Sequence, residues 1–250
     1  MKILGLNYNI KWKDKVFNFN KIEQKLSGTK ADLFLLPEMF ATGFCMEPHE
    51  IADRNMETLQ WMQSFAKQNN AAVCGSASVM EDGKFYNRMY FVKPDGSFHQ
   101  YDKRHLFSFS GEDKVYEQGD ERVVVEYLGV NILLQICYDL RFPVFSRNRN
   151  DYDIALYVAN WPDKRVTAWE HLLKARAIEN QAAVFGLNRI GQDGNGLHYT
   201  ESSHCFFADG SVISEKQNDF VIAEVDMERL TLFRTHYQFL SDADDFTLKV

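Results

Sequence analysis

The chain has 250 residues, of which 45% are hydrophobic and 25% charged, and its net charge at pH 7 is −7. These proportions are typical of a soluble globular protein with a substantial core. The acidic balance and the lack of a run rich in Lys and Arg exclude the usual basis for binding nucleic acid or an anionic membrane, because contacts with phosphate need clustered basic side chains.

The N-terminus and the cysteines bear on the cellular compartment. The apolar stretch at residues 2–8 is short and polar residues follow it at once, so we interpret it as a first strand and not as a signal peptide. No run reaches the roughly 18 apolar residues that a membrane span needs. The cysteines show no C-x-x-C spacing, and we expect free thiols in a reducing cytoplasm. They are Cys45, Cys74, Cys137 and Cys205.

Short apolar runs between turn residues predict most of the fold as strands. In chain order these runs cover residues 2–8, 32–37, 71–78, 85–93, 98–101, 122–127, 130–137, 154–159, 183–189, 202–207 and 219–226. Apolar residues at helical spacing predict helices over residues 17–26, 56–65, 166–180 and 227–232. Asp-Gly pairs at 82–83, 95–96 and 209–210 indicate tight turns.

Many of the predicted strands are apolar without strict alternation, as expected where both faces of a sheet are buried. Strands that pair as hairpins stand beside strands that alternate with helices. The mixture predicts an α/β fold with two mixed sheets whose outer faces are covered by helices. No linker, repeat or shift in composition divides the chain, so we expect a single domain over residues 1–250.

Three reactive residues lie just past the ends of predicted strands. Glu38 follows the run at 33–36, Lys103 follows the run at 98–101, and Cys137 ends the run at 130–136. Ligand crevices in α/β proteins form at the carboxyl ends of strands, where segments that are distant in sequence meet. We therefore expect these three side chains to converge.

Cys137 is the candidate nucleophile. A free cysteine is more often a small core residue, but here a turn over residues 138–142 leads to Pro143, which suits the first turn of a helix. Backbone N–H groups at such a turn stabilise a thiolate and a developing oxyanion. Cys74 and Cys205 lie within apolar runs, and Cys45 lies in a loop away from a strand end.

A nucleophilic thiol needs a base, and Glu38 is the candidate. None of the seven histidines stands in a setting typical of a cysteine protease. A carboxylate at a dry strand end has a raised pKa and can carry a proton. Lys103 beside the thiolate would keep it ionised and stabilise an oxyanion. The alternative for Glu38 and Lys103 is an ordinary solvated side chain.

Several motifs resemble those of the nitrilase superfamily of carbon–nitrogen hydrolases, in order and over nearly the whole chain. They are L-P-E-M-F at 36–40, Y-D-K-R-H-L-F at 101–107, C-Y-D-L-R-F-P at 137–143, N-W-P at 160–162, A-R-A-I-E-N-Q at 175–181 and N-R-I-G-Q-D-G-N-G at 188–196. The resemblance is closest to the bacterial omega-amidase branch, which hydrolyses ω-amides of 2-oxo acids such as 2-oxoglutaramate.

The resemblance implies a four-layer α-β-β-α sandwich that forms a homodimer or a higher homo-oligomer. It also implies a catalytic triad of Glu38, Lys103 and Cys137 without a cofactor. A second glutamate after the lysine is often required, for which Glu112 is the first choice and Glu117 the alternative. One departure from the family pattern lies in residues 199–210, where Glu201 replaces a small residue, and this leaves the substrate range open.

These roles give a mechanism in which the thiolate attacks the amide carbon and a thioester forms. The oxyanion is held by Lys103 and the backbone N–H of Tyr138. Arg165, just after N-W-P, is proposed to bind the substrate carboxylate, because its guanidinium suits bidentate contacts; a solvated arginine is an equal alternative. Lys164 is its neighbour, and Arg141 is expected to pair with Asp139. The pocket walls are expected to include Phe40, Phe44 and Trp161.

Two kinds of alternative stay open. One is another enzyme of the superfamily, such as an N-carbamoyl hydrolase, a nitrilase or an N-acyltransferase. The other is a metabolite-binding protein without activity, against which the intact set of Glu38, Lys103 and Cys137 argues. A metal enzyme is disfavoured because the sequence has no paired-histidine motif such as H-E-x-x-H.

Overall fold

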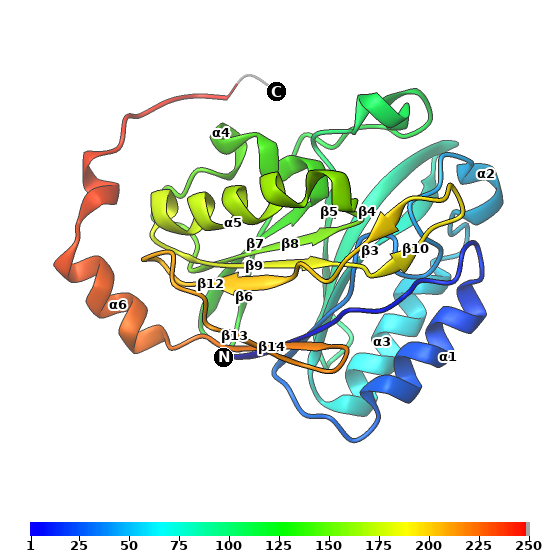
Figure 1. Ribbon diagram of the computed structural model, residues 1–250, viewed down its shortest axis with the longest axis horizontal. Coiled ribbons are helices and arrows are strands. Elements are labelled where there is room, and N and C mark those ends of the chain that lie inside the picture. The colour runs from blue at the N-terminus through cyan, green and yellow to red at the C-terminus, as the bar shows by residue number, and fades with distance from the viewer. Residues whose placement is uncertain (249–250) are drawn as a thin grey trace.

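A computed structural model describes residues 1–248 and shows two β-sheets stacked face to face between helices (Figure 1). The layers follow the order α-β-β-α, so the predicted sandwich of two mixed sheets is confirmed. Among these residues, none of the helices combines the length and the apolar character needed to cross a bilayer.

The first sheet has seven strands, and it contains both the first and the last strand of the described residues. Their order across the sheet is β13 (Ser214–Gln217), β14 (Phe220–Glu224), β1 (Lys2–Leu6), β2 (Leu33–Leu35), β3 (Ala72–Glu81), β4 (Lys84–Val92) and β5 (Phe98–Asp102). The three central strands β1, β2 and β3 run parallel, and the outer pairs are antiparallel. The β3–β4 hairpin turns at Asp82 and Gly83, both with positive φ, as the sequence predicts.

The second sheet has five strands. Their order is β12 (His204–Phe206), β9 (Ala183–Asn188), β8 (Ile154–Ala159), β7 (Val130–Ile136) and β6 (Val124–Tyr127). Strands β7, β8 and β9 are parallel, so their carboxyl ends lie along one edge. A small separate hairpin, β10 (Gly191–Gln192) with β11 (His198–Tyr199), follows β9.

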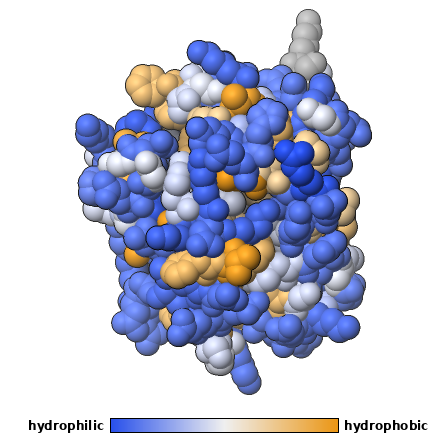
Figure 2. Space-filling view, turned by 90° about the vertical axis from the view of Figure 1, so that its right-hand side faces the viewer, coloured by the Kyte–Doolittle hydropathy of each residue, from blue (hydrophilic) through white to orange (hydrophobic). Residues whose placement is uncertain are grey.

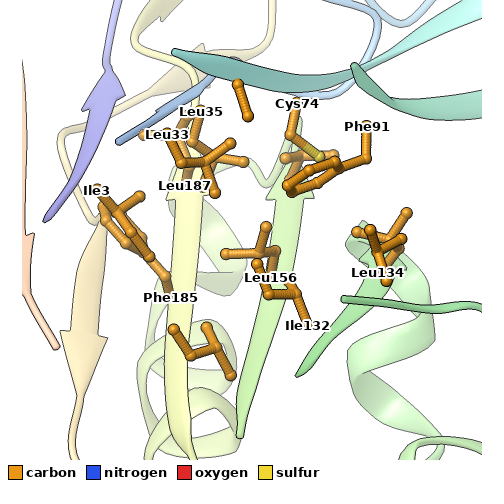
Figure 3. Close-up of a cluster of buried hydrophobic side chains, with 14 of the residues drawn as sticks. Ile3, Leu33, Leu35, Cys74, Phe91, Ile132, Leu134, Leu156, Phe185 and Leu187 are labelled. Atoms are coloured by element: carbon orange, nitrogen blue, oxygen red, sulfur yellow. The ribbon is translucent and has the colours of Figure 1, made fainter. Parts of the chain in front are cut away.

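The main core lies between the two sheets and is built from the inward side chains of both (Figure 3). It includes Leu35, Cys74 and Phe91 from the first sheet and Leu134 and Phe185 from the second, all fully buried. Because each central strand is covered on both faces, its sequence is nearly continuous in apolar residues. The four cysteines are unpaired, as expected.

The α-helices of residues 1–248 are α1 (Lys15–Leu26), α2 (Pro48–Ile51), α3 (Glu57–Asn69), α4 (Pro143–Ser146), α5 (Val166–Asn180) and α6 (Met227–His236), and three of them cover the outer faces of the sheets. The apolar sides of α1 and α3 pack on the first sheet, and α5 packs on the second. Five short 3₁₀ helices join these elements: η1 (Ser108–Ser110), η2 (Glu112–Lys114), η3 (Cys137–Arg141), η4 (Asp163–Arg165) and η5 (Phe239–Asp242).

The structure differs from the prediction mainly at short elements and helix ends. Helix α1 begins at Lys15, two residues earlier than expected, because the Asp14 side chain accepts a hydrogen bond from the N–H of Phe17 and caps the helix. Strand β13 (Ser214–Gln217) is mostly exposed and polar, so it has no apolar run to predict it. The same holds for the two-residue strands of the β10–β11 hairpin.

Close packing of α5 on the second sheet gives a prediction about stability. A Cβ added at Gly186 in β9 would lie 2.3 Å from a methyl carbon of Leu173 and 2.8 Å from the Trp169 ring, and both side chains are fully buried. We expect Gly186→Ala to lower the free energy of unfolding by about 1–3 kcal/mol, measured by urea denaturation. In a Leu173→Ala background the same change should cost less, and an equal cost in both backgrounds would contradict this account.

Candidate active site

The candidate residues meet where the carboxyl ends of strands from both sheets come together. Glu38 follows β2, and Lys103 follows β5 directly. From the second sheet, Cys137 follows β7 directly and Asn160 follows β8. The four residues thus come from distant segments and two different sheets. Figure 2 shows the side of the molecule that lies on the right of Figure 1, and the surface there is largely hydrophilic with small separate hydrophobic patches.

Lys103 lies between two carboxylates, and we call Glu38, Lys103 and Glu112 the charge cluster. The ammonium Nζ of Lys103 donates to Glu38 Oε1 at 2.9 Å and to Glu112 Oε1 and Oε2 at 3.1 and 2.9 Å. None of the three residues is more than 1% exposed. The Nζ also lies 5.2 Å from the centre of the Phe44 ring, a favourable cation–π distance.

Charges within the cluster change its acid–base properties. Burial alone would lower the pKa of Lys103, but the negative charges of Glu112 and Glu38 outweigh it and raise that pKa well above its usual range. Burial raises the pKa of Glu112, and the Glu38 charge adds to this while Lys103 opposes it. Lys103 is therefore a permanent cation at neutral pH.

Two asparagines fix Glu38 from opposite sides. Nδ2 of Asn87 donates to Glu38 Oε1 at 2.8 Å and to Glu112 Oε1 at 3.1 Å. The backbone N–H of Asn160 donates to Glu38 Oε2 at 2.8 Å, and its Nδ2 donates to the Glu38 carbonyl oxygen at 2.6 Å. The sequence analysis gave neither residue a role, although Asn160 is the first residue of the N-W-P motif. The signal for Asn87 was a polar side chain in the middle of the apolar run of β4, fully buried in the structure.

Cys137 begins η3 with a left-handed backbone, φ 44°. Such a conformation is uncommon for a residue other than glycine and marks a sharp turn between β7 and η3. Burial raises the pKa of the Cys137 thiol well above its usual range; the Glu38 charge adds to the rise, and Lys103 opposes it. The thiol therefore keeps its proton at neutral pH, next to the carboxylate that can accept it.

Asp139 holds the turn that carries Cys137. Its Oδ2 accepts from the N–H of Ile136 at 2.9 Å and from the Tyr101 hydroxyl at 2.8 Å. Its Oδ1 accepts from the N–H of His105 at 2.9 Å and lies 2.8 Å from His105 Nδ1. Because Tyr101 and His105 flank Lys103 in sequence, this buried carboxylate ties the cysteine turn to the lysine segment.

The two glutamates after Lys103 are in different environments. Glu112 is fully buried and, besides its bonds to Lys103, accepts from the N–H of Phe107 at 2.6 Å. The Glu117 side chain is 52% exposed and lies 3.8 Å from Lys84 Nζ on the surface. Glu112 is thus the second glutamate of the charge cluster, the position for which the sequence left two choices.

Cys137 lies at the wall of a cavity of about 540 Å³. Aromatic, polar and charged side chains line the rest of it, and these are Trp12, Phe44, Cys45, Met46, Glu47, Phe107, Ser110, Tyr138, Arg141, Asn160, Trp161, Pro162, Arg165, Asp193, Gly194, Asn195, Leu197 and Tyr199. The cavity therefore includes Phe44, Tyr138, Trp161 and Arg165 from the sequence-based list. The three residues of the charge cluster are buried and are not among the residues that line the cavity.

Two guanidinium groups face this cavity. Arg165 lies over the Phe107 ring at 5.2 Å, and Arg141 lies over the Trp161 ring at 5.0 Å. Within residues 1–248, neither guanidinium has a hydrogen bond or an ion pair with a protein group. The expected pairing of Arg141 with Asp139 is wrong, because Asp139 accepts its hydrogen bonds from the segment around Lys103. Two cations are thus available to a bound anion.

Two other sequence-based expectations need correction or completion. Phe40 does not line the cavity, because it packs with Phe19 and Trp61 in the core between the first sheet and its helices. Lys164 is exposed and also lies outside the cavity lining. In the divergent segment after residue 198, Tyr199 borders the cavity, whereas Glu201 binds Asn7 and Lys216 away from it.

Comparisons with known proteins agree with this geometry. The sequence model of the carbon–nitrogen hydrolase family matches residues 3–235. The chain is 44% identical to omega-amidase YafV of Escherichia coli K12, over 99% of this chain and 98% of that protein. It is 33% identical to 2-oxoglutaramate amidase of Bacillus subtilis strain 168, over 79% of each.

Among solved structures, the chain is similar to XC1258 from Xanthomonas campestris, described as a CN-hydrolase superfamily protein with an arsenic adduct in the active site. The TM-score is 0.94 and the identity 38%, over 100% of this chain and 99% of that one. The similarity extends over the whole fold, including both sheets and the segments that carry the charge cluster.

The charges around Cys137 predict how its thiol titrates. Since the negative charge of Glu38 raises the pKa of Cys137, Glu38→Gln should lower that pKa and let thiolate form at lower pH. The measurement is the ultraviolet absorbance of thiolate against pH, with Cys137→Ala as the blank for the other cysteines. Glu117→Gln, which removes an exposed charge outside the cluster, should leave the curve in place. A curve that moves to higher pH in Glu38→Gln would refute the assignment.

Proposed function

The chain belongs to the carbon–nitrogen hydrolase family, and within that family we propose that it acts as an omega-amidase. The substrates are small 2-oxo dicarboxylic acid monoamides such as 2-oxoglutaramate and 2-oxosuccinamate, and the products are the dicarboxylic acid and ammonia. One observation carries the choice of substrate: the cavity that Cys137 lines also presents two arginines whose guanidinium groups have no hydrogen bond or ion pair within residues 1–248. The full-length similarity to an omega-amidase supports it.

In the first half of the proposed reaction, Glu38 takes the proton of the Cys137 thiol, and the sulfur attacks the amide carbon. The negative charge that forms on the amide oxygen is stabilised by Lys103 and by the backbone N–H of Tyr138 at the start of η3. Glu38 then returns the proton to the nitrogen, the carbon–nitrogen bond breaks, and ammonia leaves. The raised pKa of the thiol fits a proton transfer that is coupled to attack.

In the second half, water replaces ammonia in the site. Glu38 takes a proton from this water, whose oxygen attacks the thioester carbon. The carbon–sulfur bond breaks, the thiol regains a proton, and the carboxylic acid leaves. Glu112 holds the Lys103 ammonium from the side opposite Glu38 and keeps it aimed at the reacting oxygen through both steps.

Arg165 and Arg141 are the proposed partners of the substrate's 2-oxo carboxylate. Both reach the cavity beside Cys137, and both stack on aromatic rings that limit their motion. A guanidinium binds a carboxylate through two parallel hydrogen bonds, so one arginine suffices for the carboxylate and the second is available to the adjacent oxo oxygen. Phe44 and Trp161 provide the apolar walls for the short carbon chain.

The same cavity disfavours glutamine, which carries an ammonium where the proposed substrates carry an oxo group. Its two acidic side chains are already engaged: Glu47 pairs with Lys13, and Asp193 accepts from the Tyr199 hydroxyl and from two backbone N–H groups. Two arginines that lack a counter-ion among residues 1–248 repel a further cation. The charge pattern therefore favours 2-oxo acids over amino acids.

Further features of the proposal rest on the family and the sequence. We propose that the enzyme works in the cytoplasm, needs no cofactor and assembles as a homodimer or a higher homo-oligomer. Another amidase or an N-carbamoyl hydrolase of the same family is the alternative, and substrate profiles separate these.

The substrate profile is the direct test. Ammonia release should be rapid with 2-oxoglutaramate and 2-oxosuccinamate and much slower with glutamine or a simple nitrile. Cys137→Ala should lower kcat by at least about a thousandfold, because it removes the atom that forms the thioester. Circular dichroism would show that the variant is folded. Turnover of a nitrile at a similar rate, or persistent activity in Cys137→Ala, would contradict the proposal.

The roles of the arginines can be tested separately. Arg165→Ala and Arg141→Ala should each raise KM for 2-oxoglutaramate by about ten- to a hundredfold, which corresponds to one lost hydrogen bond to a charged group. KM for butyramide, which lacks a carboxylate, should change little. Lys164→Ala is the matched control, because this neighbouring cation is exposed outside the cavity. A similar rise for both substrates would exclude a carboxylate contact.

A further inference from the structure

Trp161 contacts both of the arginines that face the cavity. Its indole Nε1 donates to the carbonyl oxygen of Arg165 at 2.7 Å, and the centre of its ring lies 5.0 Å from the guanidinium carbon of Arg141. The two contacts use different parts of one side chain, the N–H at its edge and the aromatic face. Trp161 is therefore linked to both groups that are proposed to bind the substrate carboxylate.

Trp161 is itself held through its backbone and its ring. Its backbone N–H donates to Asn188 Oδ1 at 2.7 Å, and its carbonyl oxygen accepts from Asn188 Nδ2 at 2.8 Å. Its ring packs against Trp169, with 5.3 Å between the ring centres, and the residue is 3% exposed. A side chain packed in this way has little freedom to move, so it gives the two arginines a fixed support.

The two guanidinium groups need such a support in the empty cavity. Within residues 1–248 neither of them has a hydrogen bond or an ion pair, and both arginines are half-buried. Two like charges that face one cavity repel each other, and a side chain that must be ordered by its ligand weakens the binding. An aromatic face attracts a cation and restrains it before the ligand arrives.

The segment around Trp161 also carries a contact to the proposed base. Asn160, directly before Trp161, donates its backbone N–H to Glu38 Oε2 at 2.8 Å. Both bonds between Trp161 and Asn188 use the main chain of Trp161, so they hold this segment without the indole. Loss of the indole should therefore affect the arginines and leave Glu38 in place.

We propose that Trp161 is a positioning residue that holds Arg141 and Arg165 in one carboxylate-binding arrangement and thereby sets the preference for amides that carry a carboxylate. This inference rests on the proposed omega-amidase function and adds the residue that prepares its anion site. A site whose cations are already oriented binds an anion with a smaller loss of side-chain freedom. The indole acts through the arginines and needs no contact with the substrate.

The test compares a charged and an uncharged amide in Trp161→Phe, which keeps an aromatic face for Arg141 and loses the indole N–H. KM for 2-oxoglutaramate should rise about three- to tenfold, the effect of one hydrogen bond, while KM for butyramide and kcat for both amides change by less than about twofold. An unchanged KM for 2-oxoglutaramate, equal rises in KM for both amides, or a fall in kcat alone would overturn the inference.

The arginine variants show whether the indole acts through them. In Arg165→Ala, the change Trp161→Phe should add little to KM for 2-oxoglutaramate, because the side chain that the hydrogen bond positions is already absent. In Arg141→Ala, the same change should keep its full effect. An undiminished effect of Trp161→Phe in Arg165→Ala would contradict a role through that arginine and overturn the inference.

Two further variants keep the test decisive. Trp161→Leu also removes the aromatic face, so it should raise KM for 2-oxoglutaramate by about a further two- to fivefold, and it serves if Trp161→Phe does not fold. Trp169→Phe is the matched control, because it loses an indole N–H that donates to the Ser202 carbonyl oxygen at 2.9 Å, outside the cavity lining. It should leave the ratio of the two KM values unchanged, and a change as large as in Trp161→Phe would refute the assignment.

Binding without turnover separates this inference from the proposed function. 2-Oxovalerate carries the 2-oxo carboxylate and no amide, and its Kd can be measured by calorimetry. The Kd should rise about three- to tenfold in Trp161→Phe and stay unchanged in Trp169→Phe.

The two kinds of failure then give different results. If the wild type does not hydrolyse 2-oxoglutaramate but its Kd for 2-oxovalerate depends on Trp161 in this way, the substrate assignment fails and the inference stands. If the wild type hydrolyses 2-oxoglutaramate and Trp161→Phe leaves the Kd unchanged, the inference alone fails. A wild type that binds no 2-oxovalerate would overturn the inference as well.

Discussion

The buried ammonium of Lys103 requires negative charge around it, and this requirement organises the centre of the molecule. Removing an ion from water costs several kcal/mol unless close partners compensate. Glu38 and Glu112 provide that compensation from two different segments, and they in turn need donors, which Asn87, Asn160 and the N–H of Phe107 supply. Burial and, after it, the negative charge of Glu38 raise the pKa of the neighbouring Cys137 thiol, which therefore keeps its proton. The proposed nucleophile, its base and the cation that stabilises the oxyanion thus depend on the same set of buried charges.

The fold makes this balance possible by packing two sheets face to face. The core between the sheets sets the distance between them (Figures 1 and 3). The residues that follow the carboxyl ends of β2, β5, β7 and β8 therefore lie close together. The loops after these strands are held by buried polar contacts and not by apolar packing alone. Asp139, which bonds both the turn at Cys137 and the segment after Tyr101, is the clearest example.

The sequence predicts the strands well, because strands that are buried on both faces are continuous apolar runs with turn residues at their ends. It places Glu38, Lys103 and Cys137 at strand ends for the same reason. It predicts less well where a side chain's direction depends on local geometry. Asp139 and Arg141 are close in sequence and opposite in charge, but residues two apart on a helical turn do not face each other, so the expected pair does not form. Asn87 and Asn160 act through partners from other strands, which the order of residues alone does not reveal.

The protonated state of the resting thiol has a consequence for the lifetime of the protein. Peroxides and electrophilic metabolites react with thiolates far faster than with thiols. Burial and, after it, the charge of Glu38 raise the pKa of Cys137, so less thiolate is open to such reagents at the wall of the accessible cavity. The carboxylate that takes the proton of the thiol when a substrate is bound thus also limits the amount of thiolate in the empty site.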